Sequence, residues 1–138
     1  MLHFTPHFQL WERPPLVPPD EIAHFVAHFG EVPKEYLDVI AGGADLEFRH
    51  TSGQYVRIWR PSGCVELDEA NNIQKYLPGA IPIGDDGGGK MIFYASGKNG
   101  PGLYLVGFGN LGINDAVWIA RTLRSLLDDG VGIDSFLQ

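Results

Sequence analysis

A glycine-rich stretch at residues 81–96, IPIGDDGGGKMIFYAS, comes close to a phosphate-binding motif. Gly84, Gly89 and Lys90 have the spacing of the G-x-x-x-x-G-K part of a P-loop. Met91 stands where a P-loop carries the Ser or Thr that binds magnesium. The run MIFYAS is typical of a strand, whereas a P-loop must lead into a helix whose N–H groups bind the phosphates. The pattern therefore favours a turn between two strands over a nucleotide site.

The same stretch carries two adjacent carboxylates. Asp85 and Asp86 would place negative charge where phosphates would sit, and their spacing lacks the alternating ligands of a calcium-binding EF-hand loop. We interpret them as the acidic tip of a solvated loop. Its glycines permit positive φ and form a structural turn: Gly84, Gly87, Gly88 and Gly89.

Two histidines are the strongest candidates for metal ligands. His24 and His28 are four residues apart on an expected helix, and Glu21 lies one turn earlier on the same side. That side lies opposite the apolar residues Ile22 and Phe25, so we expect a solvated polar face. The sequence therefore predicts no metal ion and no other cofactor.

Nucleophile motifs do not stand out in the sequence. Cys64 is the single cysteine, and a lone thiol in an apolar run is most often a small buried hydrophobic residue. None of the serines lies in a G-x-S-x-G motif. We therefore expect a protein that is not an enzyme.

An aromatic and basic stripe lies in the stretch YVRIW, residues 55–59. Tyr55, Arg57 and Trp59 alternate with apolar residues, so they would project from the sheet face opposite the core. Exposed aromatic and arginine side chains are typical anchors of protein interfaces. The alternative is that residues 1–19 cover this face. Both interpretations remain open from the sequence.

Apolar periodicity gives the expected order of elements. The pattern predicts helices at 20–30 and 32–43, strands at 45–50, 55–60 and 64–68, a short helix at 69–77, strands at 80–83, 90–96 and 102–109, and a long helix at 113–130. Helices at both ends with strands between them indicate a single α+β domain, with a mainly antiparallel sheet and flanking N- and C-terminal helices. We place this domain at residues 20–138, after a segment rich in Pro and aromatic residues at 1–19.

The charge composition of the sequence indicates which class of molecule the protein binds. The 138 residues carry a formal net charge of −7. An acidic surface repels phosphate backbones and attracts basic proteins, so we expect a protein partner and no direct binding of nucleic acid. With one cysteine, no signal peptide and no apolar run long enough to span a membrane, the sequence is typical of a cytoplasmic protein.

Several short motifs follow one another in a recognisable order. VPKEY at 32–36 leads to Gly42-Gly43, Glu66-Leu67 follows, and IPIG at 81–84 precedes DGGG at 86–89. In this order they resemble the SUKH superfamily, which includes fungal cell-wall-assembly regulators. The resemblance covers about residues 20–130. Ala41 and Lys90 depart from the family pattern, which has Asn and an acidic or amide residue at these places.

The resemblance implies an α+β fold and a binding function. Many bacterial members of the family are immunity proteins, which bind and neutralise toxins, often nucleases. Our leading hypothesis is a non-enzymatic module that covers a basic toxin domain, with Asp85 and Asp86 as contacts and Tyr55, Arg57 and Trp59 as anchors. One alternative is a regulatory binding protein without a toxin partner. Another is a small enzyme that uses Asp86 and Lys90 on a phosphorylated ligand.

Overall fold

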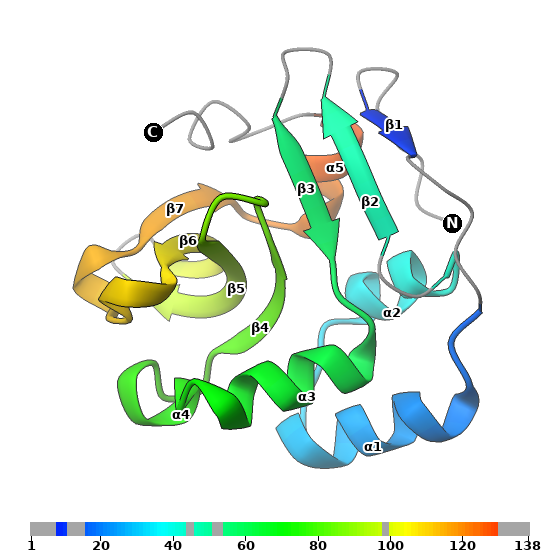
Figure 1. Ribbon diagram of the computed structural model, residues 1–138, viewed down its shortest axis with the longest axis horizontal. Coiled ribbons are helices and arrows are strands. Elements are labelled where there is room, and N and C mark those ends of the chain that lie inside the picture. Colours follow the sequence, from blue (N-terminus) through cyan, green and yellow to red (C-terminus); the bar gives the residue numbers. More distant parts are fainter. Residues whose placement is uncertain (1–7, 11–15, 44–45, 51–53, 98–99, 130–138) are drawn as a thin grey trace.

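The fold is built on a sheet in which every strand pairs with its neighbour in the chain (Figure 1). The computed structural model describes residues 8–10, 16–43, 46–50, 54–97 and 100–129. Within them, seven strands form one antiparallel sheet in sequence order. The strands are β1 (Phe8–Leu10), β2 (Leu46–His50), β3 (Tyr55–Ile58), β4 (Ile81–Asp85), β5 (Lys90–Gly97), β6 (Gly100–Gly107) and β7 (Val117–Ala120).

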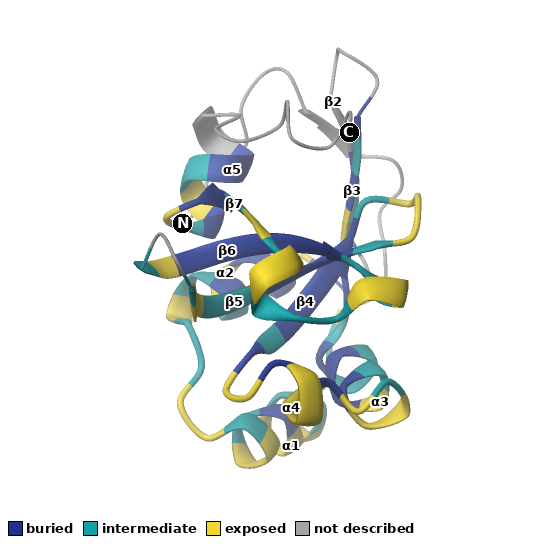
Figure 2. Cartoon of the chain, turned by 90° about the vertical axis from the view of Figure 1, so that its left-hand side faces the viewer, coloured by how far each residue is buried: buried dark blue, intermediate teal, exposed yellow. Residues whose placement is uncertain are grey.

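Helices flank this sheet near both ends of the chain and also lie between β3 and β4. They are α1 (Pro19–Phe29), α2 (Lys34–Ile40), α3 (Pro61–Ala70), α4 (Ile73–Tyr76), α5 (Leu123–Asp129) and the 3-10 turns η1 (Phe108–Asn110) and η2 (Ile113–Asp115). Helices α1 and α3 lie side by side below the sheet, and α5 packs near β7 (Figures 1 and 2). The expected α+β domain with an antiparallel sheet and flanking helices is confirmed. Among the helices of the described residues, none has both the length and the apolar character that crossing a membrane requires.

The first two helices and the hairpin follow the sequence prediction. Helix α1 begins at Pro19, because a proline is tolerated where the helical N–H needs no partner. Its apolar stripe packs inward, with Phe25 fully buried and stacked on Tyr36 of α2 at 5.0 Å between ring centroids. On β3, Val56 and Ile58 are also fully buried, as their alternation predicts. The loop of the β2–β3 hairpin, residues 51–53, lies outside the described residues.

The predicted strand at 64–68 is wrong, because these residues belong to helix α3. Pro61 opens the helix, and Pro61, Cys64, Val65 and Asp68 are buried. Their spacing of three and four residues marks one helical face. Five alternating residues were too short a window to separate a strand from this face. On the other side of the helix, Glu66 and Glu69 are exposed.

The predicted long helix at 113–130 is also wrong. The chain forms η2, then strand β7, and only then α5. Strand β6 offers a free edge that β7 pairs with, and this tertiary pairing overrides the local helical pattern. The stripe that predicted one helix is divided between two elements: Ile119 and Ala120 are buried on β7, and Leu123, Leu126 and Leu127 are buried on α5.

Candidate functional site

The glycine-rich stretch forms the expected connection between two strands. β4 ends at Asp85, β5 begins at Lys90, and residues 86–89 form the turn that we call the glycine loop. Met91, which replaces the P-loop hydroxyl, is fully buried on β5. A strand rather than a helix therefore follows the motif, so the loop lacks the helix N-terminus on which a P-loop holds phosphate.

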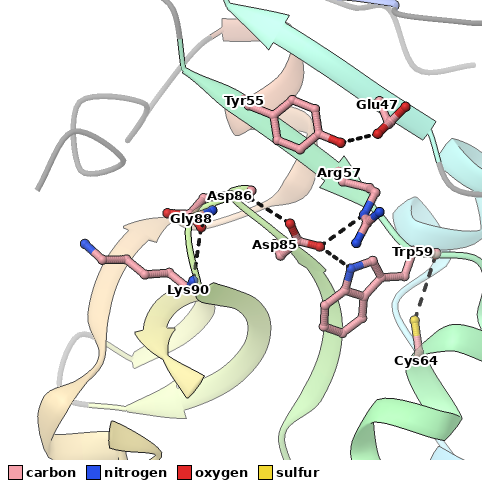
Figure 3. Close-up of polar contacts among 10 residues, drawn as sticks. Glu47, Tyr55, Arg57, Trp59, Cys64, Asp85, Asp86, Gly88 and Lys90 are labelled. Atoms are coloured by element: carbon pink, nitrogen blue, oxygen red, sulfur yellow. Dashed lines mark hydrogen bonds and ion pairs between the residues drawn. The ribbon is translucent and has the colours of Figure 1, made fainter. Parts of the chain in front are cut away.

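The backbone donors of the glycine loop already have carboxylate partners. Gly87 N–H donates to Asp85 Oδ1 at 2.8 Å, and Gly88 N–H donates to Asp86 Oδ1 at 2.8 Å. Lys90 N–H donates to the same oxygen of Asp86 at 3.0 Å (Figure 3). The carboxylates of Asp85 and Asp86 thus occupy the backbone N–H groups that a phosphate-binding loop would use to bind a phosphate.

Asp85 is not a residue of the solvated loop tip, as the sequence had suggested. It is the last residue of β4 and only 8% of it is exposed. Its Oδ2 accepts hydrogen bonds from Trp59 Nε1 at 2.6 Å and Arg57 Nε at 3.2 Å (Figure 3). A buried carboxylate needs such partners to offset lost hydration, so Asp85 holds β4 to β3. Asp86 remains the part-exposed acid of the glycine loop.

Trp59 is also more buried than an exposed interface anchor. Only 3% of the residue is accessible, and its ring is stacked with Phe108 at 6.3 Å between centroids. Phe108 is held there because its N–H donates to the carbonyl of Gly89 at 3.0 Å. The indole is therefore held in one position between β3 and the glycine loop by Asp85 and Phe108. The Arg57 side chain beside it is 45% exposed.

Tyr55 is fixed by a carboxylate on the neighbouring strand. Its hydroxyl donates to Glu47 Oε1 on β2 (Figure 3). Burial raises the pKa of Tyr55 above its usual range, and the hydrogen bond to Glu47 raises it further. The phenol thus stays protonated and keeps donating to Glu47.

Together these side chains line an open groove of about 660 Å³. Its lining contains all five residues predicted as partner contacts: Tyr55, Arg57, Trp59, Asp85 and Asp86. The structure therefore brings together residues about 30 positions apart in the chain. It adds three residues that sequence reasoning did not select: Leu67 of α3 and Phe108 in this groove, and Glu47, which lines a depression beside it. Leu67 was not selected because residues 64–68 were assigned to a strand instead of helix α3. Phe108 was not selected because an apolar side chain does not by itself indicate a binding site.

Lys90 lies apart from this arrangement. The lining of the groove in the described residues includes Asp86 but not Lys90. In Figure 3 the Lys90 side chain extends away from Arg57 and Trp59. The Lys90 backbone N–H donates to Asp86 Oδ1, whereas Lys90 is not part of the described lining of the groove.

The predicted metal candidates do not meet at one point. His24 is exposed, and Glu21 accepts hydrogen bonds from Arg60 and from Ser62 N–H instead. His28 contacts Asp68 of α3, with 2.8 Å between Nε2 and Oδ2. In the described part of the chain, no three His, Cys, Asp or Glu side chains gather into a possible metal site.

The lone cysteine, Cys64, lies in the hydrophobic core. Cys64 is fully buried in α3, and 3.3 Å separate its Sγ from the hydroxyl oxygen of Tyr36. The same tyrosine donates to the carbonyl of Trp59 at 2.7 Å. Cys64 therefore packs behind the groove, on the side of the core.

No protein-family model matches the chain, and a search of the curated proteins finds no relative.

Proposed function

We propose that the chain is a non-enzymatic protein-binding module, and specifically a cytoplasmic immunity protein of the SUKH type. It would neutralise a toxin by covering the toxin's active site or substrate groove. The observation that carries this proposal is the convergence of the aromatic stripe and the acidic turn on one open groove. Such a mixture of aromatic, arginine and acidic side chains is typical of protein interfaces.

Charge supports a basic partner. Asp85 and Asp86 outnumber Arg57 in the groove, and the whole chain has a net charge of −7. The glycine-loop donors are already bound to carboxylates, so the loop favours cations over anions. A toxin that acts on nucleic acid presents cations for phosphates, and carboxylates can occupy those positions instead.

Two alternatives differ from this proposal in kind. A regulatory binding protein would use the same groove for a partner that is not a toxin. A small enzyme would need Asp86 and Lys90 to act on one phosphorylated ligand, and the direction of the Lys90 side chain gives this alternative no support.

The decisive experiment first asks whether a secreted toxin is encoded next to this gene, and then uses that toxin. We expect co-expression of the chain to restore growth to cells that make the toxin domain, and the two purified proteins to elute together in size-exclusion chromatography at micromolar concentration. Failure to associate would refute the immunity function for that toxin. Absence of a neighbouring toxin gene would favour the regulatory alternative.

A thermal-shift screen with magnesium and nucleotides tests the enzyme alternative. A ligand present at about 100 times its Kd would stabilise the folded chain by about 2.7 kcal/mol. We expect no shift. A stabilisation that disappears in Lys90→Ala would contradict the binding-module proposal.

A further inference from the structure

The groove is one part of a longer depression that follows helix α3. A second hollow of about 290 Å³ shares Arg57, Trp59 and Leu67 with the groove. A third, of about 420 Å³, shares Phe108 and continues past the end of α3 to Tyr76. We call these three adjoining hollows, which share lining residues, the α3 channel.

Residues on one side of α3 and its C-cap contribute to the lining of all three hollows. Leu67 lines the first two hollows, Gly63 lines the second, and Ala70 and Asn71 line the third. Their spacing of four and then three or four residues places them on the same side of the helix. The ten residues of α3 rise about 15 Å, which corresponds to four or five residues of an extended chain at about 3.3 Å each.

The channel has an excess of carboxylates along its length. Glu47 lies at one end, Asp86 in the middle and Asp115 at the other end. Arg57, the one cationic side chain in the described lining, is paired with the buried Asp85. With Asp85, the lining of the three hollows in the described residues therefore carries four carboxylates and one cation.

Aromatic faces accompany these acids. Tyr55 and Phe108 line the channel. Tyr76 borders its far hollow, and Lys75 Nζ already lies over the Tyr76 ring, 5.5 Å from its centroid. A guanidinium group stacks on aromatic rings and forms paired hydrogen bonds with carboxylates, whereas an ammonium group does so less well. The lining thus favours arginine over lysine.

We propose that the α3 channel binds an extended, arginine-bearing segment of the partner protein, four or five residues long. The proposal rests on the protein-binding function and specifies which part of the partner enters the groove. In an extended chain alternate side chains point the same way, so arginines at every second residue would face Glu47, Asp86 and Asp115 in turn.

The test measures binding of three capped pentapeptides by isothermal titration calorimetry. Their sequences are Arg-Gly-Arg-Gly-Arg and the same peptide with Lys or Glu in place of Arg. We expect the arginine peptide to bind most tightly, the lysine peptide more weakly and the glutamate peptide not at all. Equal binding of the arginine and glutamate peptides would overturn the proposal.

Two isosteric variants locate the bound peptide. Asp86→Asn keeps an oxygen for the Gly88 and Lys90 N–H groups, and Glu47→Gln keeps one for the Tyr55 hydroxyl, so both variants should fold. We expect each variant to raise the Kd of the arginine peptide by about 5-fold, because one charge-assisted contact is lost. The matched control Asp38→Asn removes the same charge from an exposed position on α2 and should change the Kd less than twofold. Equal weakening by the control would mean that only overall charge attracts the peptide.

The complex with the toxin separates this inference from the proposed function. If the toxin complex forms and neither Asp86→Asn nor Glu47→Gln weakens it, the channel inference fails and the immunity function stands. If no toxin complex forms but the arginine peptide binds with the expected dependence on Asp86, the channel inference stands and the immunity function fails.

Discussion

At the scale of single residues, several carboxylates act as connectors between elements far apart in the chain. Glu21 joins α1 to the start of α3, Asp68 joins α3 to α1, and Asp85 joins β4 to β3. None of these roles follows from local sequence, because each depends on a partner at least 26 residues away. This explains why the sequence located Asp85 at the site but described it as a solvated loop residue.

Glu21 makes the stability of the fold depend on pH. Hydrogen bonds from Arg60, supported by Ser62 N–H, lower the pKa of Glu21 from 4.5 to about 2, although burial acts in the opposite direction. A lowered folded-state pKa gives stability that is complete above the unfolded value and is lost as pH falls toward the folded value. We expect the free energy of unfolding to fall by about 2–3 kcal/mol between pH 5 and pH 2 from this group alone.

Urea titrations across this pH range measure the effect. In Glu21→Gln the side chain no longer titrates, so the variant should be less stable at pH 6 and its stability should depend less on pH between 5 and 2. A variant that keeps the full pH dependence of the wild type would show that Glu21 does not cause it.

At the scale of elements, the sequence predicted those whose periodicity agreed with their tertiary surroundings. Helix α1, the β2–β3 hairpin and the β4–β5 connection are of this kind. Helix α3 and strand β7 were missed, since the burial of Asp68 and the free edge of β6 can be seen only in three dimensions. The groove could be predicted as a set of polar and aromatic residues but not as a shape, because α3 forms one wall.

Gly84 is required for the approach of β4 to β3. A Cβ at this position would lie 2.2 Å from the carbonyl oxygen of Arg57, a backbone atom that cannot turn away. We expect Gly84→Ala to destabilise the protein by about 2–3 kcal/mol or more, because it overpacks the pair of strands that carries the groove.

The matched control is Gly107→Ala. A Cβ there would meet nothing within 4 Å, and φ is −67°, which any residue can adopt. Urea unfolding should show a large loss for Gly84→Ala and a change below about 1 kcal/mol for Gly107→Ala. Equal losses in the two variants would contradict the close-approach argument.

At the scale of the whole molecule, Glu35 ties the C-terminal helix back to the second helix. Its carboxylate accepts hydrogen bonds from the Tyr94 hydroxyl and from Leu123 N–H, each at 2.6 Å. It therefore caps the first turn of α5 and links α2, β5 and α5. Burial, with help from Glu35, raises the pKa of Tyr94 far above its usual range, so this hydroxyl remains a donor.

Glu35→Ala should destabilise the whole fold by about 2–4 kcal/mol, since it leaves the Tyr94 hydroxyl and the Leu123 N–H without an acceptor. Glu35→Gln keeps an acceptor oxygen at the site and should lower the free energy of unfolding by less than Glu35→Ala does. Chemical unfolding measures both, with Asp38→Ala on the exposed side of α2 as the control. If Glu35→Ala is no more harmful than Asp38→Ala, the link does not hold α5 in place.

The match between strand order and chain order has a consequence for synthesis of the protein on the ribosome. Each strand after the first finds its neighbour already made, so the sheet can grow from the N-terminus as the chain emerges. The β2–β3, β4–β5 and β5–β6 pairs are joined by short connections, which keeps the loop-closure cost of these three pairs low. The buried leucines of α5 arrive after the sheet, and the Glu35 link then fastens this late helix to one of the earliest.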